Sequence, residues 1–320
     1  MAEQSVRRNL LKHIGVVEES YPLQNFSPLR SGGVADYFTI ATTTVELTSA
    51  VRAAIDTKIP YFIMGQAKGI LFSDGGFPGL VIQNTSSSLA VARDKSQIVA
   101  DSGVSLKRLI TVAANQGLGG LTDFFGYEGT VGGALYSNIK EGGHSLSSSV
   151  RYMTALMPPS RLEQEATIVR HKVDWLLEGD EPTKLQHLKI SQPLYVSQPV
   201  LLTVLFQLTN VRTDEVRLRL NRQSEAFQKT SPKDTTTMLG PLFEDLPGVK
   251  VEELLKGIQA YKMKEENLGV DRRFPNFIRS KGSVPVRAAA IRSLIERLQE
   301  EIQKKYGEIL LCRYEYLGVW

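Results

Sequence analysis

The chain has 320 residues and a formal net charge of +4, with 42% apolar and 22% charged residues. These proportions are typical of a soluble globular protein and exclude a disordered or fibrous one, while the length allows two or three domains. No apolar run reaches the roughly 20 residues that a membrane-spanning helix needs, and the N-terminal segment has no secretory signal pattern. A cytoplasmic protein without a membrane partner is therefore expected.

In chain order, the first predicted element is a helix that ends before Pro60. Its apolar residues recur on one helical face, at Leu47, Val51, Ala54 and Ile55. Short β-rich runs then predict three strands, over 61–64, 80–83 and 97–100. The turn residues 73–76 separate the first two strands. A helix over 106–114 follows, and Gly117 is its expected end.

The second half of the chain begins with a strong strand signal. The run 200–208, VLLTVLFQL, predicts a buried strand. Residues 214–229 predict a charged amphipathic helix, and 286–305 predict a long helix with one buried apolar stripe. Gly307 is the expected end of that helix, and 309–316 predicts a closing strand. The pattern changes from short β-rich runs to charged helical segments near residue 210, where we expect a domain boundary.

Two glycine-rich loops are the most informative motifs. Gly129-Thr130-Val131-Gly132-Gly133 has three glycines in five residues, and Gly65-Gln66-Ala67-Lys68-Gly69 directly follows the apolar run 61–64. Glycine lets a backbone turn tightly and bring its N–H groups close to an anion, where a Cβ would collide. The two loops therefore predict a phosphate-bearing cofactor held between backbone segments.

The order of several segments resembles the UDP-N-acetylenolpyruvoylglucosamine reductases, flavoenzymes that complete UDP-N-acetylmuramate for peptidoglycan synthesis. The resemblance runs from Leu29 to Gly318 and is carried by these segments: LRSGGVADYF, GQAKGILFSDGGFPGLVI, ADSGVSLKRLITVAANQGLGGLTDFFGYEGTVGGALYSN, FPNFIRSKG and LCRYEYLG. It implies an α+β fold, with a two-part FAD-binding domain of the vanillyl-alcohol-oxidase (PCMH) type and a smaller α/β substrate domain near the C-terminus. The implied bounds are 1–209 for the FAD-binding domain, split near 85, 210–308 for the substrate domain, and 309–320 for a terminal strand that returns to the FAD-binding domain.

The resemblance also implies which residues bind FAD. They come from the two glycine loops and a nearby asparagine, namely Gly65, Gln66, Ala67, Lys68, Gly69, Gly129, Thr130, Val131, Gly132, Gly133 and Asn138. The first loop departs from the small glycines and the serine-asparagine pair of the family. Bulk at Gln66 would obstruct a pyrophosphate, whereas Lys68 would bind one. Retention and loss of FAD both remain open at this point.

The catalytic positions depart further. In the family, hydride from the flavin reaches the enolpyruvyl carbon, a serine protonates the neighbouring carbon, and an arginine and a glutamate stabilise the developing charge. The resemblance places the serine at Pro241, the glutamate at Arg313 and the arginine at Glu178. A general acid needs an exchangeable proton, and proline has none to give. All three catalytic positions are therefore substituted.

Two functions stay open. The substitutions favour an impaired or inactive FAD-binding protein that keeps the fold and a flavin or nucleotide-sugar site. The alternative is an active NADPH- and FAD-dependent UDP-N-acetylmuramate dehydrogenase with compensating residues. In that alternative Arg313 would supply the charge lost at Glu178, and Thr236 or Thr237 would supply the proton, since Tyr314 and Tyr316 would lie on the strand face opposite Arg313. No protein partner is predicted.

Other signals have plain structural interpretations. The glycines of 117–120 follow a helix and fit a helix end better than a dinucleotide fingerprint. Basic residues are dispersed among acidic ones, so no nucleic-acid partner is predicted, and Arg287, Arg292 and Arg297 are expected on a solvated helix edge. The pair Glu244-Asp245 would repel a UDP-linked carboxylate. Neither Cys312 nor the four histidines have the spacing of a metal site, the histidines being His13, His144, His171 and His187.

Overall fold

The computed structural model describes residues 2–141, 143–157, 166–171, 199–233, 235–282 and 285–320. The chain folds into two compact units, and each is built from several separate stretches of sequence. Unit 1 comprises Met1–Glu19, Tyr37–Lys68 and Gly79–Phe227, and unit 2 comprises Ser20–Asp36, Gly69–Pro78 and Gln228–Trp320. The first glycine loop therefore ends where unit 1 gives way to unit 2.

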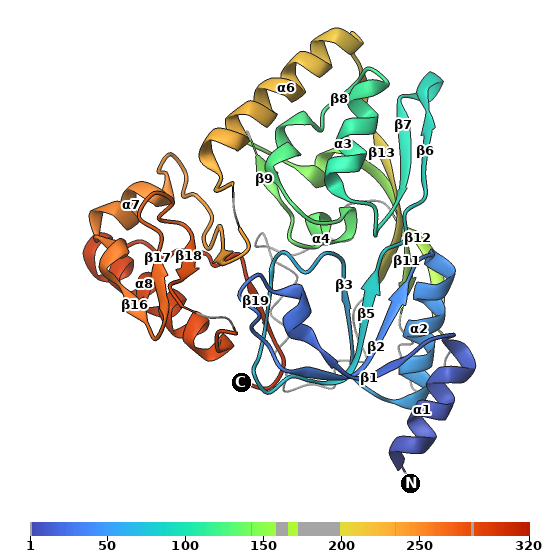
Figure 1. Cartoon of the computed structure of the whole chain (residues 1–320). Coiled ribbons are helices and arrows are strands. Elements are labelled where there is room, and N and C mark those ends of the chain that lie inside the picture. Colours follow the sequence, from blue (N-terminus) through green and yellow to red (C-terminus); the bar gives the residue numbers. More distant parts are fainter. Residues whose placement is uncertain (1, 142, 158–165, 172–198, 234, 283–284) are drawn as a thin grey trace. The chain divides into compact units, whose positions relative to one another are not determined.

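A four-stranded sheet and two helices form the N-terminal part of the fold. The sheet has the order β1-β2-β5-β3, with β1 Glu18–Pro22, β2 Val34–Ala41, β3 Tyr61–Met64 and β5 Phe77–Asn84. Strands β3 and β5 pair in parallel. Helices α1 (Ala2–His13) and α2 (Thr44–Thr57) lie side by side in Figure 1. The hydroxyl of Thr43 caps α2 by accepting a hydrogen bond from the N–H of Glu46 at 3.1 Å.

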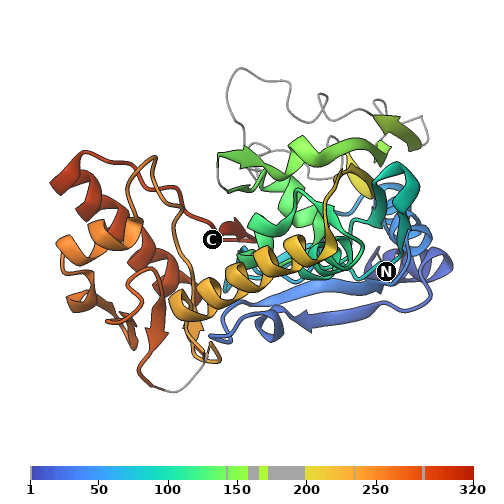
Figure 2. The same ribbon diagram turned by 90° about the horizontal axis from the view of Figure 1, so that it is seen from above.

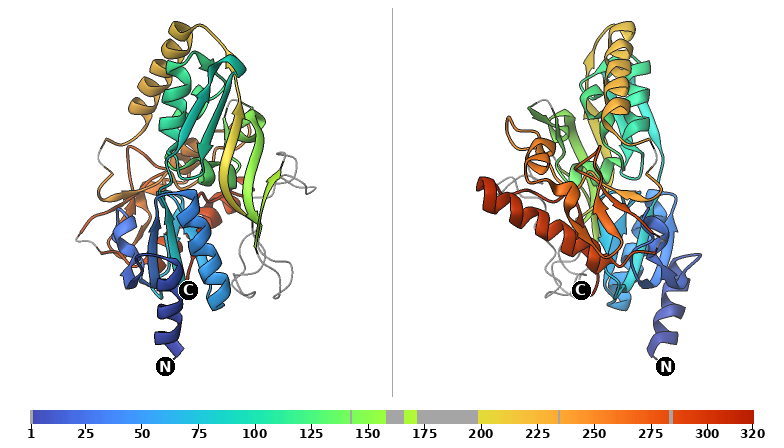
Figure 3. Two further views of the ribbon diagram at one scale, coloured as in Figure 1. Left: turned by 90° about the vertical axis from the view of Figure 1, so that its right-hand side faces the viewer. Right: turned by 60° about the vertical axis from the view of Figure 1, so that its left-hand side comes forward.

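The second layer of unit 1 is an antiparallel sheet of five strands. Its order is β12-β11-β13-β7-β6, with β6 Leu89–Ala92, β7 Gln97–Asp101, β11 Val150–Met157, β12 Thr167–His171 and β13 Val200–Gln207. Figure 3 (left) shows β11, β12 and β13 next to one another. Helix α3 (Leu106–Asn115) buries Leu106, Leu109 and Ile110 in the core beneath this sheet.

Short elements complete unit 1. Gly117 ends α3 with a φ of +69°, and its N–H bonds to the carbonyl of Ala114 at 3.1 Å. The glycines of 117–120 therefore begin at a helix end, as predicted, whereas the short strand β8 was not predicted. The remaining elements are β8 Leu118–Gly119, α4 Val131–Tyr136, β9 Lys140–Glu141, β10 His144–Ser145, β14 Thr209–Asn210 and α6 Thr213–Thr230, of which the last three residues belong to unit 2.

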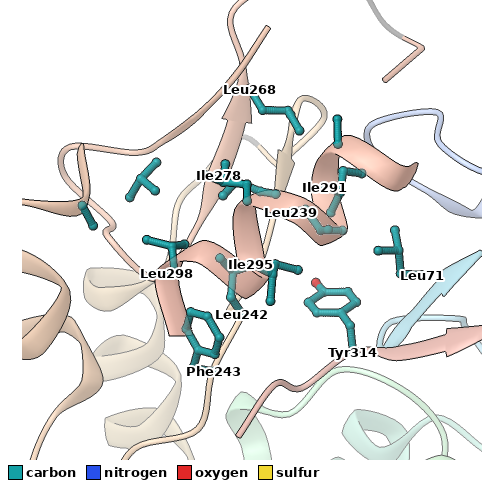
Figure 4. Packing of buried hydrophobic residues seen from close by; sticks show 14 of the residues in the cluster. Leu71, Leu239, Leu242, Phe243, Leu268, Ile278, Ile291, Ile295, Leu298 and Tyr314 are labelled. Atoms are coloured by element: carbon teal, nitrogen blue, oxygen red, sulfur yellow. The ribbon is translucent and has the colours of Figure 1, made fainter. Parts of the chain in front are cut away.

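Unit 2 combines a small sheet with two helices. The sheet has the order β15-β18-β17-β16 and is antiparallel throughout, with β15 Met238–Leu239, β16 Lys264–Glu265, β17 Leu268–Val270 and β18 Ile278–Ser280. Helices α7 (Val251–Gly257) and α8 (Ala288–Tyr306) lie beside it in Figures 1 and 2. Figure 4 shows the core, where α8 packs Ile291, Ile295 and Leu298 against Leu239 and Leu242.

The long helix α8 begins on a cap that comes from a distant part of the chain. Both carboxylate oxygens of Asp74 accept hydrogen bonds from its first N–H groups, from Ala288 at 2.8 Å and from Ala289 at 3.0 Å. Negative charge at this end also complements the helix dipole. The helix ends at Gly307, whose φ is +74°, as predicted.

The predicted closing strand over 309–316 is too long. The structure has an isolated bridge at Cys312 and a strand β19 of only three residues, Glu315–Leu317, which pairs in parallel with β4 (Ile70–Phe72). Ile309 and Leu311 are exposed while Leu310 is buried, so alternating burial mimics a strand. The stretch from 309 to 311 has no ladder partner among the described residues.

Two glycines of unit 2 lie so close to another backbone segment that no side chain fits there. A Cβ on Gly76 would overlap the carbonyl oxygen of Val34, and one on Gly318 would overlap the carbonyl oxygen of Gly76. Gly76 also has a φ of +74°, a left-handed conformation that favours glycine. These segments therefore cross backbone to backbone.

Gly76→Ala is expected to destabilise the protein through this overlap. Gly248 is the matched control, because its φ of +75° is nearly identical and no atom lies within 4 Å of its Cβ position. Gly76→Ala should lower the free energy of unfolding by about 1–3 kcal/mol more than Gly248→Ala, the usual cost of overpacking. Urea denaturation measures both variants. Equal losses would mean that only the backbone conformation matters at Gly76.

Candidate functional site

The two glycine loops meet inside unit 1. Gly65 follows β3, and a Cβ built on it would lie 2.5 Å from both Oγ1 and Cγ2 of Thr130. Only glycine fits this approach. Next to it, Nζ of Lys68 lies 2.9 Å from Oε2 of Glu128. Loops that are far apart in the sequence therefore share one location. Gly69, the last residue of the first loop, is also the first residue of a unit 2 segment.

The three central residues of the first loop, 66–68, differ in their exposure to solvent. Gln66 and Lys68 are exposed, whereas Ala67 is buried. Ala67 has a φ of +55°, a left-handed conformation that is costly for a residue with a Cβ. Alanine thus stands in a conformation suited to glycine. The bulky Gln66 side chain is on the solvent side of the loop.

Most amides of the second loop are occupied by the protein itself. The N–H of Val131 bonds to the carbonyl of Val104 at 2.8 Å, and that of Gly132 to the carbonyl of Ser102 at 2.7 Å. The N–H of Gly133 bonds to the hydroxyl of Thr130 at 3.3 Å. These three amides are therefore unavailable to a ligand.

The start of the same loop remains open. No described residue accepts a hydrogen bond from the N–H of Gly129 or of Thr130. Gly129 has a φ of +126°, and no atom lies within 4 Å of its Cβ position. Two N–H groups beside an unfilled space can bind an anion. Asn138, at the end of α4, lies apart from these amides in the chain and accepts a bond from the Ser147 hydroxyl at 3.5 Å.

A buried polar cluster supports the second loop, and sequence reasoning missed it. The side-chain amide of Asn84 donates to the hydroxyl of Ser102 at 2.9 Å, and its carbonyl oxygen accepts from the N–H of Ser86 at 3.0 Å. Ser102 in turn holds Gly132 through its backbone carbonyl. The available signal was a run of polar residues, 83–88, directly after the apolar residues 80–82 of a predicted strand.

Asp101 is a buried carboxyl next to this cluster. It is 7% exposed, and its Oδ2 accepts a hydrogen bond from the N–H of Ser88 at 2.9 Å. Burial raises the pKa of Asp101, although the bond from Ser88 opposes the rise. The folded chain therefore holds this proton more tightly than the unfolded chain does.

Asp101→Asn is accordingly expected to change the pH dependence of stability. Because the folded-state pKa is raised, the contribution of Asp101 to the free energy of unfolding falls as pH rises above the ordinary range of the carboxyl. Asparagine keeps an acceptor for the N–H of Ser88 without the charge. The variant should be more stable than the parent at pH 7, and the difference should shrink toward pH 4, measured by urea denaturation. A difference that is the same at both pH values would contradict this account.

Unit 2 brings together two of the three residues that the family resemblance places at catalytic positions, Pro241 and Arg313. Pro241 lies in a backbone segment over 240–244, which we call the strap. The carbonyl of Leu242 in the strap accepts a hydrogen bond from the N–H of Arg313 at 2.8 Å. A Cβ on Gly69 would lie 3.3 Å from the carbonyl oxygen of Arg313. Glu178 lies in 172–198, outside the described residues.

Asn276 fixes the strap from its other side. It is 6% exposed, and its side-chain oxygen accepts from the N–H of Leu242 at 3.1 Å and from the N–H of Phe243 at 2.9 Å. Its side-chain N–H₂ donates to the carbonyl of Phe243 at 3.0 Å. The backbone that follows Pro241 is therefore held by a neutral amide, which is not an acid.

The hydroxyl of Tyr316, close to Arg313 in the chain, is a poor proton donor. Burial raises the pKa of the Tyr316 hydroxyl, with Cys312 adding to the rise, and the Tyr316 oxygen lies 3.9 Å from Sγ of Cys312. The ring of Tyr316 packs edge-on against Trp320, and the guanidinium of Arg292 lies 5.0 Å from the ring centroid. Tyr314 is buried in the core of unit 2. This arrangement is a packing cluster.

Several charged residues singled out in the sequence have local structural partners. Asp245 accepts from the N–H of Val251 at 2.9 Å and pairs with Lys250 at 2.6 Å, so it serves the start of α7. The three arginines of α8 and its N-cap each pair with a glutamate: Arg287 with Glu266, Arg292 with Glu296, and Arg297 with Glu265. These surface ion pairs account for the row of arginines on α8 and its N-cap without a binding partner.

The described residues hold neither a cluster of metal-ligating side chains nor a helix suited to a membrane. No three or more His, Cys, Asp or Glu side chains of the described chain are grouped so as to hold a metal ion. Within the same residues, no helix combines the length and apolar character that crossing a membrane would require.

Comparison with known proteins agrees with the fold. The FAD binding domain family matches residues 35–162. The chain is 25% identical to UDP-N-acetylenolpyruvoylglucosamine reductase 2 of Symbiobacterium thermophilum, over 97% of this chain and 95% of that protein. It is 22% identical to the reductase of Carboxydothermus hydrogenoformans, over 99% of this chain and 100% of that one.

A solved structure shows the same architecture. The crystal structure of UDP-N-acetylenolpyruvylglucosamine reductase (MurB) from Thermus caldophilus matches with a TM-score of 0.70 and 20% identity, covering 95% of this chain and 99% of that one. Together with the family match, this confirms the predicted α+β fold with a PCMH-type FAD-binding domain.

Proposed function

We propose that this chain, a divergent member of the UDP-N-acetylenolpyruvoylglucosamine reductase family, binds FAD but is impaired in reducing the enolpyruvyl substrate. In this proposal unit 1 holds the flavin, and unit 2 carries the positions that would act on the nucleotide sugar. The observation that carries the proposal is the pinned strap, in which Pro241 stands at the expected proton donor and Asn276 fixes the backbone around it.

The residues of the glycine loops fit the diphosphate of FAD. The N–H groups of Gly129 and Thr130 have no acceptor among the described residues, and the space beside Gly129 is unfilled. Lys68 adds a cation at the same loop. Bound FAD would supply hydride transfer. The N–H groups of Gly129 and Thr130 would bind the diphosphate, and the bonds that the loop donates to the carbonyls of Ser102 and Val104 would keep it in position.

Impaired chemistry follows from the groups around the strap. Pro241 has neither an O–H nor an N–H, and the side chain of Asn276 is a neutral amide with its polar atoms engaged. Loss of a general acid typically slows a reaction by about 10²–10⁴-fold. We therefore expect slow reduction even when flavin, NADPH and nucleotide sugar are all present.

An active reductase is the second candidate, and one observation favours it. Arg313 is bonded through its backbone to Leu242, the residue after Pro241. A permanent positive charge there would stabilise an enolate-like anion if its side chain reached the substrate. NADPH would serve as reductant in both candidates, as the family resemblance implies.

Absorbance and turnover test the proposal in two steps. The purified protein is saturated with FAD and desalted, and retained flavin is quantified by its visible absorbance. Oxidation of NADPH is then followed with and without UDP-N-acetylglucosamine enolpyruvate. Retained flavin with little substrate-dependent oxidation supports the proposal. A protein that retains no FAD refutes the cofactor assignment, and rapid substrate-dependent turnover would establish the second candidate.

A further inference from the structure

The ion pair between Lys68 and Glu128 joins the two glycine loops. The side chains are 48% and 60% exposed, and Nζ lies 2.9 Å from Oε2. Glu128 immediately precedes Gly129, whose N–H has no acceptor among the described residues. The lysine ammonium is therefore held at the loop that offers amides to an anion.

The exposure of this pair makes it easy to exchange. Ion pairs that are this accessible to water gain little net stability, because water and salt screen them and both side chains lose freedom. A diphosphate presents more negative charge than one carboxylate and several acceptor oxygens. A lysine ammonium has three N–H donors on a flexible stem and can turn from one acceptor to another.

The neighbouring contact keeps the loops together while the pair exchanges. Gly65 lies directly against Thr130, and Thr130 is fixed as the cap of α4 through the N–H of Gly133. The approach of the loops thus rests on the packing of the Gly65 backbone against the Thr130 side chain. Lys68 can leave Glu128 without the loops losing this contact.

We propose that Lys68 changes its ion-pair partner when a ligand binds. In the free protein its ammonium pairs with Glu128, and in the complex it binds the diphosphate of a dinucleotide. The inference rests on the FAD binding of the proposed function and names the residue that would tune it. Glu128 then competes with the ligand for Lys68 and lowers affinity, whereas Lys68 raises it. The two members of one ion pair therefore have opposite effects on binding.

Flavin titration of paired variants tests these opposite signs. FAD is titrated into the flavin-free full chain, and binding is followed by the change in flavin fluorescence, for the parent, Glu128→Gln and Lys68→Met. Glu128→Gln should lower the Kd by about 2–5-fold, because FAD then no longer has to break an exposed ion pair, whose free energy corresponds to a factor of this size. Lys68→Met should raise the Kd by about 10-fold, because a charge-assisted bond to phosphate is lost.

Controls separate the local effect from net charge. Glu225→Gln and Lys229→Met make the same charge changes at exposed positions of α6 and should leave the Kd unchanged. Raising the salt concentration should weaken FAD binding of the parent more than that of Lys68→Met, because screening acts on the contact that the variant lacks. Thermal unfolding of each variant verifies folding.

The outcomes distinguish this inference from the proposed function. Tighter binding by Glu128→Gln together with weaker binding by Lys68→Met supports the exchange. If the parent binds FAD and Glu128→Gln fails to tighten binding, or Lys68→Met fails to weaken it, the exchange is overturned and the proposed function stands. If neither the parent nor Glu128→Gln binds FAD, both are overturned.

Discussion

Replacing Pro241 by serine is expected to raise substrate-dependent NADPH oxidation by about 10²-fold, the lower end of the usual contribution of a general acid. Serine restores an exchangeable proton at a position whose backbone is held on both sides, by Asn276 and by the N–H of Arg313. The gain stays at the lower end because Arg313 and Glu178 still occupy positions that the family resemblance assigns to other charges. Steady-state kinetics of the FAD-loaded protein measures it.

The matched control is Pro241→Ala, which removes the ring but adds no hydroxyl. It should remain as slow as the parent, while reduction of bound flavin by NADPH alone should be similar in all three proteins. A Pro241→Ser variant that binds FAD and substrate but gains no activity would contradict the idea that the hydroxyl is the missing group. A gain shared by Pro241→Ala would point to the ring itself as the obstacle.

Arg313→Glu adds a second step to the same series. Groups that act on one transition state are strongly non-additive, so the carboxylate should matter only in the Pro241→Ser background. There it should increase activity further. Reduced activity on adding Arg313→Glu would instead favour the second candidate function, in which the arginine supplies a compensating charge.

Regular elements were predictable because their sequences carry strong periodic signals. The apolar stripe of α8 and the glycine that ends it determine that helix locally. The closing strand was overestimated because the consecutive apolar residues 309–311 favour a strand while the partner strand β4 is only three residues long. The number of residues that pair in a strand depends on the partner strand as well. The sequence of the closing segment alone therefore could not show where pairing begins.

The candidate site was predictable only where a backbone requirement selects glycine. Gly65 and Gly129 drew attention for this reason, and the structure supplies the cause in the approach of Thr130 and in a positive φ. The sequence could not show that the amides of 131–133 are already engaged. Those bonds depend on carbonyls of Ser102 and Val104, which belong to another part of unit 1.

Asn276 is the clearest residue that pattern reading cannot find, since one buried asparagine in a loop has no periodicity. Asn276→Ala is expected to lower the free energy of unfolding by roughly 2–6 kcal/mol, because the N–H and the C=O of buried Phe243 each lose their bond at about 1–3 kcal/mol. The N–H of Leu242 keeps a second acceptor, the backbone carbonyl of residue 276, at 2.9 Å, so it adds little to the loss.

Urea denaturation of Asn276→Ala measures this loss, with Asn221→Ala on α6 as the exposed control, which should stay within about 0.5 kcal/mol of the parent. The same substitution tests whether the strap must be rigid for chemistry. In the Pro241→Ser background, Asn276→Ala should cancel the gain in turnover, because a serine on a loosened strap no longer stays within hydrogen-bond reach of one carbon. If the double variant kept the full gain while losing stability, the strap would need only the serine hydroxyl and not the fixed backbone, and the asparagine would serve folding alone.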